Sequence, residues 1–361
     1  MGANVDDRRA PIRQDGLDLR NHDRVLVFAP HPDDESIASG GLLQIARSVG
    51  AAVRVVVLTD GDNNPWPQRW VEKRWRIGNA ERARWGARRR EEARAAMSIL
   101  GVAQHDTSFL GLPDLGLTEL LMRADAQVIE SLRGHIDEFK PSLLVLPALS
   151  DRHPDHSATH IFSRLALGQC KASMPQLLPF AVHGKTPGES LISVGLSAAQ
   201  RDIKQAAILA HASQMQLSQR RFLRYAANVE SYLLVPPQPV ANPHHPLQAG
   251  VDRQGVLHVR IDLKNCGSLR SQDLFCAIES ADAGSLRWQV PLDLRSTQTE
   301  VRLTAGAVGA AATWRRERGN VTVSLISPGL AGLRQGYAKL ARAQPGWRVF
   351  DRFGWQPVVR S

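Results

Sequence analysis

The chain has 361 residues, and at roughly 150 residues per domain this length predicts two or three domains. Hydrophobic residues make up 43% of the chain and charged residues 22%, an ordinary globular composition that excludes a disordered chain and a small disulfide-stapled protein. The 3 cysteines form no C-x-x-C pair, which argues against a disulfide framework and a thiolate zinc site. A sparse, odd cysteine count fits the reducing cytoplasm, which is the compartment we expect.

The chain is basic. It carries 45 Lys and Arg against 35 Asp and Glu, a net charge of +10 that attracts polyanions such as nucleic acid, anionic lipid and acidic saccharides. The first twenty residues are charged and lack the apolar stretch of a signal peptide. Apolar runs such as 143–146 are far shorter than the roughly 20 residues that span a bilayer, so we expect no transmembrane segment.

The first two thirds of the chain alternate between strand and helix patterns. Short apolar runs rich in β-branched residues predict buried strands at 24–29, 53–59 and 143–147. Helical spacing of apolar residues predicts helices between them, at 40–49 and 87–100. This alternation predicts an α/β domain with a Rossmann-like parallel sheet flanked by helices. Further along the chain we expect a strand at 178–183 and a long helical region from 198 to about 225.

The character of the sequence changes after residue 235. Residues 235–246 contain five prolines in twelve positions, which predicts a stiff linker over 236–247. Beyond it, apolar and polar residues alternate in short segments with Gly, Asn and Ser between them. We therefore expect a small all-β, sandwich-like accessory domain over 248–361. The segments that carry the alternation are 256–263, 274–278, 301–303 and 321–326.

Two polar clusters follow two of the predicted strands. The first contains His31, Asp33 and Asp34, and the second spans residues 150–156. Sites in such sheets form where the carboxyl ends of the strands meet their loops. If the chain turns helical after the first cluster, His31 and Asp34 share a face and Asp33 projects elsewhere. This geometry offers two metal ligands and one separate carboxylate.

Histidine and carboxylate ligands without cysteine are typical of catalytic zinc, which keeps an open position beside three protein ligands. Zinc lowers the pKa of its bound water to about 7 and polarises a carbonyl, and a neighbouring carboxylate can take the proton of that water. One such cluster would fit a loop of caps and turn residues equally well. Two clusters, each after a predicted strand, favour a metal-dependent hydrolase.

These residues resemble the PIG-L/LmbE family of zinc-dependent N-deacetylases, whose signature is an A-H-P-D-D-E loop followed later by H-P-D-H. The chain carries a variant with proline before His31, and it carries H-P-D-H at 153–156. The resemblance covers roughly residues 22–230 and predicts a catalytic domain over 1–235. Supporting stretches are Gly40-Gly41, Leu58-Thr-Asp-Gly61, Arg89-x-x-Glu92, Leu110-Gly-Leu-Pro-Asp114 and Ala210-His-Ala-Ser-Gln214.

The resemblance implies a role for each matching residue. It implies that zinc is bound by three ligands, His31, Asp34 and His156. Asp33 would be the general base that activates water. His153 would stabilise the tetrahedral intermediate or protonate the leaving amine. Asp155 would orient a neighbouring histidine from outside the ligand set. Two further positions match residues that contact the sugar in family members, Arg89 and Asp114; a surface salt bridge and a turn aspartate are the structural alternatives.

A basic, aromatic segment at about 62–90 departs from the family pattern. Between residues 65 and 90 lie eight arginines, one lysine and four tryptophans, against two acidic residues. Tryptophan faces stack on sugar rings and arginines pair with phosphate or carboxylate groups, so we expect a lid with substrate contacts from Trp66, Arg69 and Trp70. The alternative is a packed helical insertion with a solvated basic face.

The sequence thus predicts a zinc hydrolase that removes acetyl from an N-acetylglucosamine-type amino sugar in a glycan, glycolipid or glycoconjugate. The substrate would be anionic or carrier-linked. Fe²⁺ would accept the same ligands as zinc. An amidase acting on another N-acyl conjugate, of mycothiol or glycopeptide type, is one alternative, and a non-catalytic basic protein that binds glycans or nucleic acid is another. The intact Asp33 argues against the second alternative, so nucleic acid is not the partner we expect, and the oligomeric state is left open.

Overall fold

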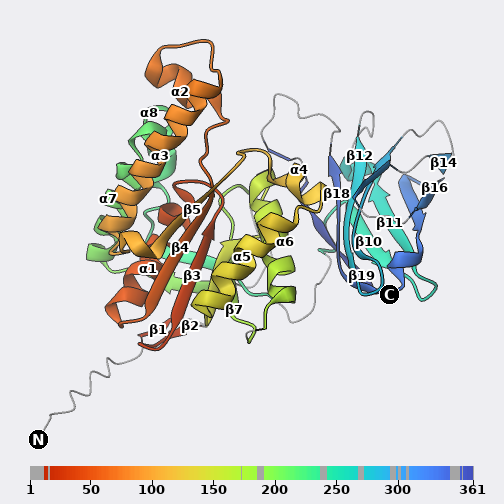
Figure 1. Cartoon of the computed structure of the whole chain (residues 1–361), viewed down its shortest axis with the longest axis horizontal. Helices are drawn as coiled ribbons and strands as arrows, with labels where there is room; N and C mark the ends of the chain where they lie inside the picture. Colours follow the sequence, from red (N-terminus) through yellow and green to blue (C-terminus); the bar gives the residue numbers. More distant parts are fainter. Residues whose placement is uncertain are drawn as a thin grey trace, which may run out of the picture. The chain divides into compact units, whose positions relative to one another are not determined.

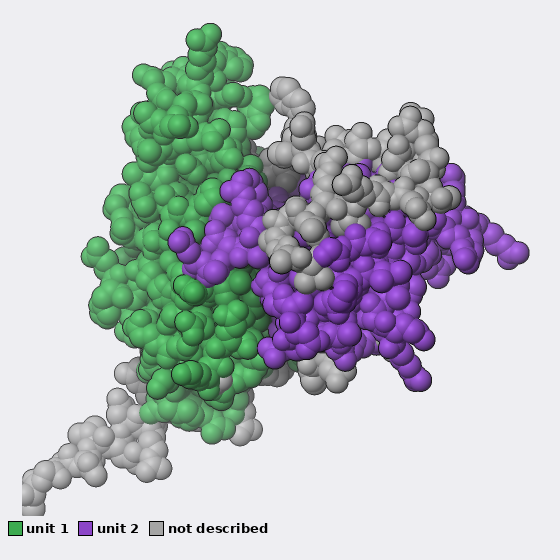
Figure 2. All heavy atoms as spheres, turned by 45° about the vertical axis from the view of Figure 1, so that its right-hand side comes forward, with its two compact units in different colours: residues 1–116, 129–148, 159–235 green, residues 117–128, 149–158, 236–361 purple. Residues whose placement is uncertain are grey.

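The computed structural model describes residues 12–14, 17–171, 173–184, 191–235, 242–266, 272–292, 298–299, 302–305, 309–341, 350–351 and 353–360. The chain divides into two compact units, shown in Figure 2. The first unit holds residues 1–116, 129–148 and 159–235, and the second holds 117–128, 149–158 and 236–361. Half of the predicted linker, 236–241, lies outside the described residues, and the predicted domain boundaries stay predictions.

The first unit is built on a parallel sheet, as the alternating pattern predicted (Figure 1). Its strand order is β5-β4-β3-β6-β7, and every neighbouring pair runs parallel. The sequence predicted β3, β4 and β6 to within one residue, because each is a buried β-branched run. The strands are β3 (Arg24–Ala29), β4 (Ala52–Thr59), β5 (Thr107–Leu112), β6 (Leu143–Pro147) and β7 (Gln176–Phe180).

Helices cover the sheet because its strands are apolar on both faces. In β3, Val25, Val27 and Ala29 belong to one buried core cluster, and the residues between them point to the opposite face. Buried residues of α1, α3 and α7 share that core cluster with β3. The helices are α1 (Asp34–Ser48), α2 (Pro65–Glu72), α3 (Asn79–Ile99), α5 (Ala126–Phe139), α6 (Pro154–Gln169), α7 (Ala198–Ala210) and α8 (Ala212–Leu223).

The helical region predicted from 198 to about 225 is confirmed, and it consists of two helices, α7 and α8. The break between them falls at His211, whose backbone angles, φ −76° and ψ 56°, are not helical. The His211 ring is turned toward Glu35, and in the first turn of α8 Ser213 donates its N–H and hydroxyl to Glu92 of α3. Buried polar contacts therefore accompany the break, which the apolar spacing did not predict.

The second unit contains a single curled β-sheet of ten strands, mostly antiparallel. Its order is β14-β16-β17-β11-β10-β19-β18-β12-β13-β15, and its buried side chains form one core cluster. The expectation of a β-rich C-terminal region is confirmed, with one continuous sheet in place of two separate ones. The strands are β10 (Leu247–Val251), β11 (Val256–Asp262), β12 (Asp273–Ser280), β13 (Gly284–Pro291), β14 (Gln298–Thr299), β15 (Arg302–Ala305), β16 (Ala311–Glu317), β17 (Asn320–Ile326), β18 (Leu333–Ala341) and β19 (Gln356–Arg360).

Short elements complete the two units. The first unit has two small antiparallel pairs, β1 (Ile12–Gln14) with β2 (Leu17–Leu19) and β8 (Leu191–Gly195) with β9 (Val229–Leu233). The remaining helices are η1 (Gln104–Asp106), α4 (Leu117–Met122), α9 (Leu263–Cys266) and η2 (Pro328–Leu330). None of the helices in the described ranges combines the length and apolar character that crossing a bilayer requires.

Candidate metal and active site

The loop after β3 presents His31, and Asp34 fixes the position of this histidine. Asp34 opens α1, and its Oδ2 accepts the His31 backbone N–H at 3.0 Å and lies 3.2 Å from His31 Nδ1. The other ring nitrogen, Nε2, lies 3.3 Å from Oδ1 of Asp114, which follows β5. All three side chains are buried. The sequence predicted that His31 and Asp34 share a face, and their contact agrees with this expectation.

Asp33 adopts a backbone conformation that is unusual for any residue except glycine, with φ 131° and ψ −27°. The peptide bond between Pro32 and Asp33 is held from both sides. Arg89 donates to the Pro32 carbonyl at 2.6 Å, and Glu35 Oε2 accepts the Asp33 N–H at 3.0 Å. A backbone angle of this kind persists only where surrounding contacts determine it, and these two contacts do so here.

Arg89 of α3 is buried, and its bonds go to the loop. Its guanidinium donates to the Gly61 carbonyl at 2.7 Å and to Asp33 Oδ2 at 3.1 Å, in addition to the Pro32 carbonyl. Gly61 has φ 61°, and a Cβ at this position would lie 1.7 Å from the Arg89 guanidinium, so this close approach requires glycine. Arg89 therefore connects the loop after β3 to the loop after β4 by hydrogen bonds.

Burial raises the pKa of Asp33 to about 6, although the Arg89 guanidinium acts against this shift. The neighbouring Asp34 carboxylate raises the pKa of Asp33 further. A carboxyl group with a pKa near 6 is ionised at neutral pH and holds a proton more strongly than an ordinary aspartate does. This combination suits a general base.

A second histidine, His211, supports the same loop from the junction of α7 and α8. Its Nε2 lies 3.1 Å from Glu35 Oε1, and the Ser36 hydroxyl lies 3.1 Å from the same nitrogen. Burial lowers the pKa of His211, but the Glu35 carboxylate outweighs it and the net shift is upward. Glu35 thus joins His211 to the N–H of Asp33. The sequence showed only that His211 lies in a stretch that resembles the family, because its partner, Glu35, lies in the first turn of α1.

The loop after β6 holds the second cluster, and Asp151 organises it. Asp151 Oδ1 accepts the His153 backbone N–H at 2.9 Å, and its Oδ2 lies 3.1 Å from His156 Nδ1. Because a carboxylate accepts at Nδ1, the neutral His156 ring carries its lone pair on Nε2, where a metal needs it. Sequence reasoning missed Asp151. The signal was an acidic residue five positions before His156.

Asp155 was expected to orient a histidine, and the structure places its backbone there. The Asp155 N–H donates to His153 Nδ1 at 3.2 Å, and its carboxylate accepts the Leu117 N–H at 3.2 Å. Because His153 Nδ1 accepts, the neutral His153 ring carries its proton on Nε2 and can donate it. The His153 and His156 rings lie 5.1 Å apart.

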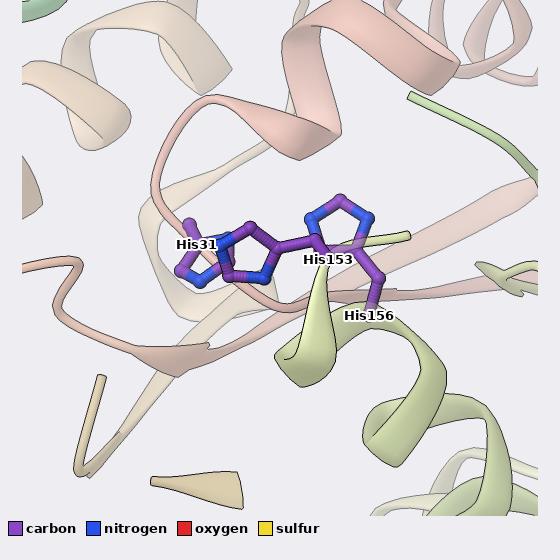
Figure 3. Close-up of side chains that lie close together, drawn as sticks. All are labelled: His31, His153 and His156. Atoms are coloured by element: carbon purple, nitrogen blue, oxygen red, sulfur yellow. The ribbon is translucent and has the colours of Figure 1, made fainter. Parts of the chain in front are cut away.

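The two loops follow neighbouring parallel strands, β3 and β6, so both leave the sheet at the same edge. Ligand atoms of His31, His153 and His156 all lie within 4.8 Å of one another. Figure 3 shows these three side chains close together. The same spacing is found for Asp151, His156 and His183, and for His31, Asp114 and Asp155. Imidazole and carboxylate are the donors that a divalent zinc or iron ion prefers. These residues, of which all but His183 are buried, therefore fit a metal ion.

A carboxylate lies against each ring nitrogen of His31, since Asp34 Oδ2 is 3.2 Å from Nδ1 and Asp114 Oδ1 is 3.3 Å from Nε2. The pKa of Asp114 is lowered. Burial is the largest single influence and raises this pKa, but the hydrogen bond and charge of His31, the Asn63 N–H and the charge of Arg89 together outweigh it.

The residues predicted to contact substrate fall into two groups. Arg89 and Asp114 are buried and engage the two loops described above. Trp66, Arg69 and Trp70 lie on α2, where the two tryptophan side chains are 52% and 66% exposed.

Comparison with known proteins agrees with the motif analysis. Residues 26–167 match the profile of the family described as GlcNAc-PI de-N-acetylase, PIG-L. A 1D-myo-inositol 2-acetamido-2-deoxy-alpha-D-glucopyranoside deacetylase from Corynebacterium glutamicum is 29% identical over 157 residues, 40% of this chain and 53% of that protein. The corresponding deacetylase 2 from Catenulispora acidiphila is 31% identical over 177 residues, 44% of this chain and 57% of that protein. The chain thus spans about half the length of the curated relatives it matches.

Likeness to solved structures is weaker. The 4-carboxy-2-hydroxymuconate hydratase GalB from Pseudomonas putida superposes with a TM-score of 0.47 at 21% identity, over 61% of this chain and 99% of that one. A likeness at this level says nothing about the reaction. The likeness to the family rests on the profile match and on the two loop motifs. Residues 26–167 of the chain are therefore similar to the PIG-L (GlcNAc-PI de-N-acetylase) family, in agreement with the resemblance that the residues around His31 and His156 indicated.

Proposed function

We propose that this chain is a metal-dependent hydrolase that removes the acetyl group from an N-acetylated amino sugar of N-acetylglucosamine type. The sugar would be part of a larger glycan, glycolipid or glycoconjugate. One observation carries the proposal: His31 belongs to a group of closely spaced histidine and carboxylate ligand atoms, and on the same loop stands Asp33, a carboxylate with a raised pKa. The relatives named as sugar deacetylases support the same reaction class.

His31, Asp34 and His156 would hold the metal, for which zinc is the proposed ion and Fe²⁺ an acceptable substitute. Asp114 and Asp151 would orient His31 and His156, since each lies against the ring nitrogen that does not face the ion. Such outer carboxylates fix the tautomer and raise the basicity of the ligand. When bound, the ion lowers the pKa of a coordinated water to about 7 and polarises the amide carbonyl.

Asp33 would take a proton from the attacking water. Its clamped backbone fixes where the carboxylate points, so little reorganisation is needed when the reaction begins. His153 would donate its Nε2 proton to the developing oxyanion or to the leaving amine, because its Nδ1 already accepts the Asp155 N–H. Arg89 and Asp114 would act mainly by positioning Asp33 and His31, and a direct contact with the sugar would add to that role.

Metal content and acetate release test this proposal together. We expect about one zinc per purified chain and acetate release from at least one member of a panel of N-acetylglucosamine conjugates. Asp33→Asn keeps the size of the side chain and removes the base, so it should lower acetate release about 100-fold or more without loss of metal. Asp106→Asn, at a partly exposed carboxylate in η1, is the matched control and should change neither quantity.

Each other outcome has a defined meaning. Bound metal without acetate release from any conjugate would contradict the acetyl and amino-sugar assignment and direct the search to other N-acyl groups. A chain that binds no metal and releases no acetate would contradict the hydrolase itself. Equal acetate release by wild type and Asp33→Asn would remove Asp33 from the reaction.

A further inference from the structure

The segment from α2 to residue 76 exposes three tryptophans to solvent. Trp66 is 52% exposed, Trp70 66% and Trp75 80%. Tryptophan is a largely buried residue on average, and Trp85 in the next helix is 1% exposed. The described tryptophans of the β-rich unit, Trp288, Trp314 and Trp355, are buried as well. Among the residues that the structure describes, the exposed tryptophans thus lie together in one short segment.

Polar contacts hold this segment in place, and its indole rings take no part in them. Asn64 accepts the Trp66 N–H at the start of α2, and two prolines lie in the first turn. Gln68 is buried and donates to the Glu81 carbonyl at 2.7 Å, and Arg84 bonds Glu72 at 2.6 Å. The tryptophan rings are therefore presented to solvent by a formed structure.

The same segment is positively charged. Lys73, Arg74 and Arg76 are exposed beside the tryptophans, and the Arg69 guanidinium lies 5.0 Å from the centre of the Trp66 ring. Arg69 also donates to the Trp75 carbonyl at 2.9 Å, which draws the turn back toward α2. Glu72, the acidic residue of the segment, is paired with Arg84, and Arg74 of the segment is paired with Glu81 of α3. We name Trp66, Arg69, Trp70, Lys73, Arg74, Trp75 and Arg76 the Trp–Arg surface.

We propose that the Trp–Arg surface docks on the surface of an anionic phospholipid bilayer. Indole rings prefer the boundary between headgroups and acyl chains, where the apolar body is buried and the N–H stays hydrated. Exposed cations beside them are attracted to anionic headgroups. Within the first unit, α2 lies beside α8 and beyond the carboxyl ends of the sheet strands (Figure 1).

Charge complementarity favours a bilayer over an uncharged glycan. A neutral sugar would contact the tryptophan rings but would not attract the exposed cations around them, whereas an anionic bilayer interacts with both. Each cation near an anionic membrane strengthens binding about fivefold. Binding that depends on both charge and tryptophan insertion therefore distinguishes this surface from the general basicity of a +10 chain.

Vesicle sedimentation with matched variants of the full chain tests the proposal. The vesicles are phosphatidylcholine with or without phosphatidylglycerol. Lys73→Ala with Arg76→Ala should weaken binding to the anionic vesicles about 25-fold, at about fivefold for each cation. Arg260→Ala with Arg316→Ala removes the same charge from exposed positions of the β-rich unit and should change binding less than threefold. Trp66→Ser with Trp70→Ser should weaken it at least tenfold.

Tryptophan fluorescence gives a second readout of the wild-type chain. Insertion of Trp66, Trp70 and Trp75 should shift the emission to shorter wavelength when anionic vesicles are added, and brominated lipid should quench it. The buried tryptophans cannot give this response. Equal loss of binding in the two double-alanine variants, or sedimentation without an emission shift, would overturn the proposal and leave non-specific charge attraction.

Two other possible ligands of the Trp–Arg surface, a substrate and a nucleic acid, would give different results in such experiments. A substrate lid predicts that the Lys73 and Arg76 variant raises KM for a water-soluble substrate in the absence of lipid, with no vesicle binding by the wild type. A nucleic-acid surface predicts salt-sensitive binding to an oligonucleotide that displaces no lipid. Either result without vesicle binding overturns docking on a bilayer. Vesicle binding is measured without catalysis, so its failure is distinct from failure of the proposed hydrolase.

Discussion

A buried ion pair holds the helix that follows the His31 loop, and its removal gives the most direct test of how the first unit is held together. Lys204 Nζ lies 2.6 Å from Glu230 Oε1, and both side chains are almost fully buried. The Glu230 carboxylate also accepts the N–H groups of Gly41 and Leu42 in the middle of α1. A Cβ at Gly41 would lie 2.3 Å from the Leu196 side chain and 3.0 Å from this carboxylate, so the glycine permits the approach.

The magnitude follows from what each substitution leaves behind. Removing one partner of a buried pair costs about 3–5 kcal/mol, because the other charge stays buried. In Lys204→Met the Glu230 carboxylate keeps three donors, the two N–H groups of α1 and the Tyr232 hydroxyl, so we expect about 3 kcal/mol. Glu230→Gln keeps one acceptor for α1 but leaves the ammonium without a counter-charge, and we expect a similar cost of about 3 kcal/mol.

Urea unfolding of the wild type, both single variants and the double variant measures these energies. The double variant should cost about 2 kcal/mol less than the sum of the two single variants, because each substitution removes the charge that the other had left uncompensated. Arg123→Met is the matched control. Arg123 pairs with Glu119 on the surface, and such an exposed pair contributes less than about 1 kcal/mol. If Lys204→Met costs no more than this control, or if the two single costs are additive, the ion pair does not hold α1.

Three further predictions concern the site and its support. Glu35→Gln should lower kcat for acetate release about 10–100-fold with little change in KM, because the Asp33 N–H loses a charged acceptor and the base moves; an unchanged kcat would show that the clamp is not needed. Asp151→Asn should weaken metal binding about 10–100-fold in chelator competition, and Asp106→Asn should leave it unchanged. Burial lowers the pKa of His160 from 6.5 to about 4. The unfolded chain therefore binds a proton at this histidine at a higher pH than the folded chain does. As the pH drops from about 6.5 toward 4, the free energy of unfolding should fall by about 3 kcal/mol. Unfolding of His160→Gln should lack this part of the pH dependence, and an equal dependence in both proteins would contradict it.

The sequence predicted the elements whose signal is local. The strands β3, β4 and β6 are continuous apolar runs, and such runs identify a strand that is buried on both faces. The polar residues just after β3 and β6 predicted where the site lies, since a parallel sheet brings the carboxyl ends of its strands to one edge. The break at His211 was not predicted, because it depends on a contact with Glu35 that lies 176 positions earlier in the chain.

The partners inside the site could be predicted only where the contact is short in sequence. His31 and Asp34 are three residues apart and share a helical face, so their contact was within reach. Asp151 was overlooked in favour of Asp155, although both flank the same histidines. Spacing alone does not say which carboxylate turns toward His156, because that depends on the path of the loop before α6. Asp155 donates its backbone N–H to His153, and its carboxylate accepts the Leu117 N–H.

Arg89 is a second residue whose contacts could not be predicted from the sequence. The resemblance implied that Arg89 on α3 contacts the sugar, which stays a prediction; the structure shows that Arg89 is buried and donates to the carbonyls of Pro32 and Gly61. The conformation of Asp33 explains why such a residue is needed. A φ of 131° costs of order 1–3 kcal/mol in a residue other than glycine, and it is retained only if the contacts on both sides of the peptide bond offset that cost. Arg89 and Glu35 supply those contacts from different elements, so the tertiary fold determines the conformation of Asp33, and its position could not be predicted from the loop sequence alone.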